Sequence, residues 1–84
     1  MLEKTKLIVD VLDIFVSLKR GLNLPDLIFQ LNDIYAPQGM KVEQEMLLEI
    51  LNELAADGYL KTFKVGVLDS WKITEEGEDH FYDL

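Results

Sequence analysis

The chain has 84 residues, 49% of them hydrophobic, and it carries 16 acidic against 8 basic side chains, for a formal net charge of −8. A chain of this length has room for one hydrophobic core and no second lobe, so we expect a single domain over residues 1–84. There is no cysteine, which excludes disulfides and thiolate metal sites.

No N-terminal stretch resembles a signal peptide, and the most apolar run, residues 7–18, is interrupted by Asp10 and Asp13. That run is also shorter than the roughly 20 apolar residues that span a bilayer. We therefore expect a cytoplasmic protein that has no membrane partner.

The distribution of charge matters more than its sum, because nucleic-acid binders usually show a local basic patch. Residues 43–58 carry five acids and no Lys or Arg, and residues 74–84 carry five more, again with no Lys or Arg. The basic residues are Lys4, Lys6, Lys19, Arg20, Lys41, Lys61, Lys64 and Lys72.

Residues 2–20 are predicted to form a long first helix that Gly21 ends. Nine of the twelve residues from Leu7 to Leu18 are apolar, which is more than one packed face requires. Two explanations stay open. Either the rest of a small domain wraps this helix, or its spare face pairs with a second copy in a homodimer. The residues expected at that dimer interface are Leu7, Val11, Ile14 and Leu18.

A second helix is predicted to begin after Asn23, which can cap it, with Pro25 in the first turn. Its apolar positions are Leu27, Ile28, Leu31, Ile34 and Tyr35. Residues 37–39, Pro-Gln-Gly, break the pattern. A third helix follows from Val42, with an apolar face of Leu47, Ile50, Leu51 and Leu54, and Gly58 is its expected left-handed end. Two short helices joined by a tight turn predict a helix-turn-helix.

Residues 61–74 are rich in β-favouring side chains around the turn formers Gly66 and Asp69-Ser70, which predicts a short β-hairpin. Thr74 can cap a final helix, whose expected packing residues are Phe81, Tyr82 and Leu84. The fold class predicted is mainly α with a small β-hairpin (α+β), in the order helix, helix, helix, wing, helix.

This order is that of the winged helix-turn-helix. The sequence Leu51…Leu54…Gly58-Tyr59-Leu60 resembles the end of the recognition helix in MarR-like and PadR-like regulators. Residues 71–77, Trp-Lys-Ile-Thr-Glu-Glu-Gly, resemble the second wing strand and the following helix start of the same families. The wing is short by comparison, and no extra dimerisation helix of the PadR kind is expected.

The resemblance places the base-reading face on Gln44, Glu45, Leu48, Glu49 and Asn52. Such faces usually carry donors to base edges and phosphates, and only Gln44 and Asn52 fit. A leucine among carboxylates suits a small protein-binding patch instead, so we expect these five residues to contact a protein partner. The alternative for Leu48 is a core position at the edge of a wide apolar stripe.

DNA binding is the second hypothesis, and it would describe a small dimeric transcriptional regulator. The nucleic-acid contacts would then come from Lys41, Gln44, Asn52, Lys61, Lys64 and Lys72. Lysines on an exposed hairpin also serve solubility and discourage edge pairing. A third hypothesis is an acidic inhibitor that mimics DNA and occupies a basic surface of its partner.

No motif for catalysis is visible, since the sequence has no phosphate-binding glycine loop, nucleophile elbow or Cys/His dyad. The single histidine, His80, lies near Glu76, Asp79 and Asp83, a pattern more typical of a solvated surface than of a metal site. We therefore expect no enzyme, no metal and no cofactor. The leading hypothesis is a protein-interaction module in a transcription- or nucleic-acid-related setting.

Overall fold

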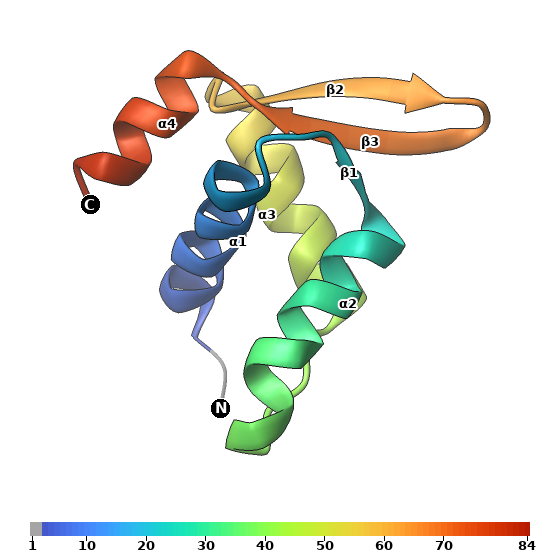
Figure 1. Ribbon diagram of the computed structural model, residues 1–84, viewed down its shortest axis with the longest axis vertical. Helices are drawn as coiled ribbons and strands as arrows, with labels where there is room; N and C mark the ends of the chain where they lie inside the picture. The colour runs from blue at the N-terminus through green and yellow to red at the C-terminus, as the bar shows by residue number, and fades with distance from the viewer. Residues whose placement is uncertain (1–2) are drawn as a thin grey trace.

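The computed structural model describes residues 3–84, which form four α-helices, one short 3-10 helix and a three-stranded antiparallel sheet (Figure 1). The elements are α1 (Lys4–Leu18), β1 (Leu22–Asn23), α2 (Leu24–Tyr35), η1 (Ala36–Gln38), α3 (Gln44–Ala56), β2 (Leu60–Val65), β3 (Leu68–Ile73) and α4 (Glu75–Tyr82). The predicted order of three helices, a hairpin and a final helix is confirmed. Leu2, the first residue of the predicted α1, lies outside the described residues.

Helix α1 lies against α2, α3, α4 and β3, so most of its circumference is covered (Figure 1). Its buried side chains are Leu7, Val11, Leu12, Ile14, Phe15 and Val16. This arrangement agrees with the explanation in which the rest of the domain wraps the first helix. The expected dimer interface must be corrected, because Leu7 and Val11 are 0% exposed and Ile14 is 7% exposed within one chain. Of those four residues only Leu18 reaches the surface.

Local sequence signals set most of the helix ends. The side chain of Asn23 accepts a hydrogen bond from the Asp26 N–H at 2.9 Å, and Thr74 Oγ1 accepts one from the Gly77 N–H at 3.0 Å. Both are N-caps, as predicted. Gly58 has φ +83°, the left-handed conformation expected after α3.

The end of α1 differs from the prediction. Lys19, with φ 51°, adopts the left-handed conformation and ends the helix two residues before Gly21. Gly21 instead leaves room for the ring of Phe63, which a Cβ atom at this position would displace.

The sheet has the strand order β1-β3-β2. Strand β1 was not predicted, because its two residues form a strand only by pairing with Trp71 and Ser70 of β3. The predicted turn at Asp69-Ser70 is wrong, since both residues lie in β3. The other predicted turn former, Gly66, is confirmed, because the hairpin turns at Gly66-Val67, where Gly66 has φ +63° as a type II′ turn requires. Each strand has six residues, and the hairpin occupies residues 60–73 where 61–74 was predicted.

A polar contact ties α1 to α2 beside the core. The buried Tyr35 hydroxyl donates a hydrogen bond to Asp10 Oδ2, and Lys6 Nζ lies 3.4 Å from the same oxygen and 5.8 Å from the Tyr35 ring centre. Burial of the phenol, followed by its hydrogen bond to Asp10, raises the pKa of Tyr35 well above its ordinary value of 10.0.

This contact predicts a loss of stability in alkali. Because the pKa of Tyr35 is higher in the folded than in the unfolded chain, its contribution is complete below about pH 10 and is lost as the pH rises toward the folded-state pKa. Tyr35→Phe should lower the free energy of unfolding by roughly 1–2 kcal/mol at neutral pH, because a hydrogen bond to a carboxylate is lost. It should also flatten the decline above pH 10. Urea unfolding at several pH values measures both, and an unchanged alkaline slope in the variant would contradict this assignment.

Candidate interaction surface

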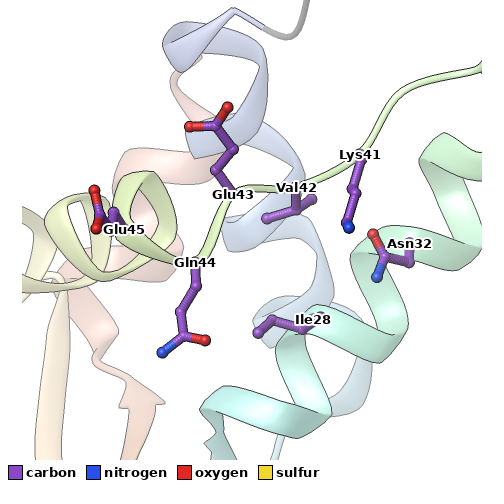
Figure 2. Close-up of a pocket in the computed structure, with 7 residues that line it drawn as sticks. All are labelled: Ile28, Asn32, Lys41, Val42, Glu43, Gln44 and Glu45. Carbon is purple, nitrogen blue, oxygen red and sulfur yellow. The ribbon is translucent and has the colours of Figure 1, made fainter.

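A groove runs between α2 and the start of α3, with a volume of about 630 Å³ (Figure 2). It is lined by Ile28, Asn32, Lys41, Val42, Glu43, Gln44 and Glu45. Figure 2 shows the side chains of Ile28 and Gln44 approaching the same space from the two helices, while Glu43 and Glu45 point away from it. The groove therefore has an apolar floor of Ile28 and Val42 and a polar rim that includes Lys41, and the two glutamates lie on its outer side.

The predicted partner-binding residues lie along the outer side of α3. Gln44, Glu45, Glu49 and Asn52 are exposed, and two of them also border the groove. Glu49 is partly engaged within the chain, because Lys4 Nζ lies 3.5 Å from Glu49 Oε1 and 2.9 Å from Glu53 Oε1. The hydrogen bond to Glu53 raises the pKa of Lys4.

Leu48 is not the exposed apolar anchor that the partner hypothesis assigned to it. It is half-buried and packs against the core, as the alternative for this residue described. The exposed aromatic side chain of α2 is Phe29, which is 67% exposed and lies one helical turn from Asn32, a residue that lines the groove. Phe29 was not predicted as a contact residue, because it falls outside the apolar stripe of α2. An aromatic residue outside that stripe is the signal that could have revealed it.

The helix-turn-helix unit itself is strongly acidic, and Lys4 of α1 is the cation that lies against Glu49 and Glu53. Between Gly21 and Leu60, the span of the helix-turn-helix unit, Lys41 is the only base and there are seven acids. Those acids are Asp26, Asp33, Glu43, Glu45, Glu49, Glu53 and Asp57. A phosphate backbone approaching this unit would meet carboxylates along both helices.

The basic side chains predicted to contact nucleic acid do not lie on one surface. The connection that carries Lys41 lies at the opposite end of the molecule from the β2–β3 hairpin (Figure 1). Within the hairpin, Lys64 pairs across the strands with Asp69, with 3.8 Å between Nζ and Oδ1. Lys61 and Lys72 lie on the other face of the sheet, because side chains alternate along a strand. Gln44 and Asn52 belong to the acidic surface of α3.

The outer sheet face, defined by Gly21, Lys61, Phe63 and Lys72, encloses a hollow of about 360 Å³. Lys61 and Lys72 are directly opposite each other in the register, so two like charges share this face. Neither lysine forms an ion pair among residues 3–84.

Comparisons with known proteins identify the fold. The structure is similar to that of a transcriptional regulator from Clostridium thermocellum, with a TM-score of 0.79 and 14% identity over 92% of this chain and 74% of the regulator. The fold is a winged helix. The structure of the DNA-recognition and protein-interaction domains of HOP2 is also similar, with a TM-score of 0.65 and 15% identity over 81% of this chain and 98% of that one.

At the level of sequence, no family model matches the chain. The search of curated proteins also gives no match. Across the described part of the chain, no helix is long and apolar enough to cross a membrane. Residues 3–84 also contain no group of three or more side chains that could hold a metal ion. His80 instead stacks on Tyr59, with 4.2 Å between the ring centres.

The Lys61–Lys72 pair leads to a prediction about stability. Like charges directly opposite on neighbouring strands are destabilising, and opposite charges stabilise by roughly 0.2–1 kcal/mol. Lys61→Glu should therefore raise the free energy of unfolding by about 0.5 kcal/mol. Lys64→Glu is the matched control, since it makes the same change in net charge but places two acids opposite each other, and it should lower stability. Chemical denaturation measures both, and shifts in the same direction would contradict the pairing.

Proposed function

We propose that this chain is a non-enzymatic winged-helix module that binds a protein partner through the surface formed by α2 and α3. The single observation behind the proposal is the charge of the helix-turn-helix unit, with seven acids and one base. The similarity to a transcriptional regulator and to HOP2 supports a transcription- or nucleic-acid-related setting. The relation to MarR-like and PadR-like regulators, the single domain over residues 1–84 and the cytoplasmic location belong to the same proposal.

Electrostatics argues against the third helix entering DNA. Phosphate neutralisation by Lys and Arg supplies most of the non-specific affinity for DNA. Here Glu45 and Glu49 occupy the exposed side of α3, and Asp26 lies in the first turn of α2. Each carboxylate would lose hydration against a polyanion and gain no cation in return.

The same surface suits a protein that carries positive charge. Phe29 and the floor residue Ile28 supply apolar area, and Glu43 and Glu45 add negative charge outside the groove, next to Lys41 on its rim. Interfaces commonly combine an apolar centre with a polar rim. The proposed partner segment therefore has an apolar or aromatic side chain flanked by Lys or Arg, and Gln44 and Asn52 contribute hydrogen bonds at its edge.

DNA binding through Lys41, Lys61, Lys64 and Lys72 is the alternative, and the unpaired lysines of the outer sheet face favour it. A DNA mimic is a further alternative that uses the acidic surface. A mimic would bind a basic partner in a strongly salt-dependent way, and DNA would compete for that partner. An interaction anchored on Phe29 would instead be lost on Phe29→Ala and would resist salt.

The proposal predicts that charge, rather than shape, keeps this winged helix off DNA. In co-sedimentation with random duplex DNA, the wild-type protein should remain unbound at low and at physiological salt. Glu45→Lys combined with Glu49→Lys should gain binding that weakens as salt rises, because phosphate contacts release counterions. The control is Glu75→Lys with Glu76→Lys on α4, which makes the same change in net charge away from this surface and should not bind.

Binding of the wild-type protein to random duplex DNA at physiological salt would contradict the proposal. Lys61→Glu with Lys64→Glu then tests the alternative. Loss of affinity and a shallower salt dependence would establish the wing lysines as the DNA contacts, and unchanged values would exclude them.

A further inference from the structure

The outer sheet face is a second surface, separate from the α2–α3 groove, that no contact within the described chain explains. Lys61 and Lys72 lie directly opposite each other beside Phe63, around the hollow over Gly21. This arrangement costs stability, and residues 3–84 provide no acid within ion-pair distance of either lysine. Phe63 is 38% exposed, so part of its ring is open to a neighbour.

An apolar strip extends this patch toward the tip of the hairpin. Val65 and Leu68 are opposite each other in the register, on the same face as Phe63, and are 61% and 48% exposed. The patch therefore joins two unpaired cations to an aromatic and aliphatic surface. Its complement would be an acidic segment that carries an exposed aromatic side chain.

The chain itself contains such a segment. On α4, Glu75, Asp79 and Tyr82 recur at i, i+4 and i+7, so they lie along one side of the helix. Glu75 and Asp79 are exposed, and Tyr82 is 66% exposed. The opposite side of α4 is held by half-buried Phe81, which packs against the core, and by the stack of His80 on Tyr59. The acidic, aromatic stripe is therefore left facing outward.

We propose that the outer sheet face of one copy binds the α4 stripe of a second copy. Lys61 and Lys72 would pair with Glu75 and Asp79, and the ring of Tyr82 would lie against Phe63. Within a single chain α4 lies beside α1 (Figure 1), and its carboxylates form no ion pair with the two lysines. A two-fold axis would allow both contacts to form reciprocally, as in most homodimers.

Such a dimer would be weak and specific. Each exposed ion pair contributes little and the aromatic pair adds attraction, whereas like charges at the same positions would repel each other. The net charge of −8 on each copy opposes association, although physiological salt screens charges beyond about 8 Å. The local contact is between opposite charges, and it differs from the interface predicted on α1, whose residues are in the core.

Reciprocal charge reversal tests the contact. Sedimentation velocity of the wild-type chain, over a concentration series at physiological salt, should show a monomer–dimer equilibrium. The sheet variant, Lys61→Glu with Lys72→Glu, and the helix variant, Glu75→Lys with Asp79→Lys, should each be monomeric, because each brings like charges together. An equimolar mixture of the two variants should dimerise, since both contacts then regain opposite charges.

The controls separate this contact from folding and from total charge. Lys41→Glu with Lys64→Glu makes the same charge change as the sheet variant outside the proposed contact and should still dimerise. In the sheet variant two acids replace the two opposed lysines, so the repulsion between the strands is about the same as in the wild type. Circular dichroism should therefore show that this variant is folded. A wild-type chain that stays monomeric at every soluble concentration would overturn the proposal, as would a dimer that survives both reversals. It would also be overturned by a mixture that remains monomeric, or by association that nuclease treatment abolishes.

Discussion

Burial of α1 on most of its sides is the constraint on which the rest of this structure depends. Leu7, Val11, Leu12 and Phe15 are fully buried, and α2, α3, α4 and β3 all pack against the helix that carries them. In a chain of 84 residues there is one core to build, and α1 is its centre. The hydrogen bond from Tyr35 to Asp10 then holds α2 at a fixed place along it.

Because the core uses α1, function has to lie on the elements around it. The helix-turn-helix unit presents an acidic surface with a groove and the exposed ring of Phe29. The sheet presents its outer face, where Lys61 and Lys72 stand without partners among the described residues. The two surfaces have opposite charge, which supports the proposal that each of them contacts a protein.

Local chemistry made much of the fold predictable. Asn23, Thr74 and Gly58 act within a few residues of the helix ends that they define, so sequence alone identified them. The failures involve distant partners. Strand β1 exists only through pairing with β3, and the pairing of β3 with β2 makes Asp69 and Ser70 strand residues instead of a turn. On α3 the outward side was predicted correctly for Gln44, Glu45, Glu49 and Asn52. The depth of Leu48 depends on what packs beside it, which periodicity does not encode.

If charge keeps α3 away from DNA, the backbone amides of this helix should not respond to it. Nuclear magnetic resonance of the ¹⁵N-labelled protein measures this residue by residue in a titration with random duplex DNA at low salt. We expect the amide resonances of residues 44–52 to stay unchanged at excess DNA. Chemical-shift changes concentrated on these residues would contradict this expectation.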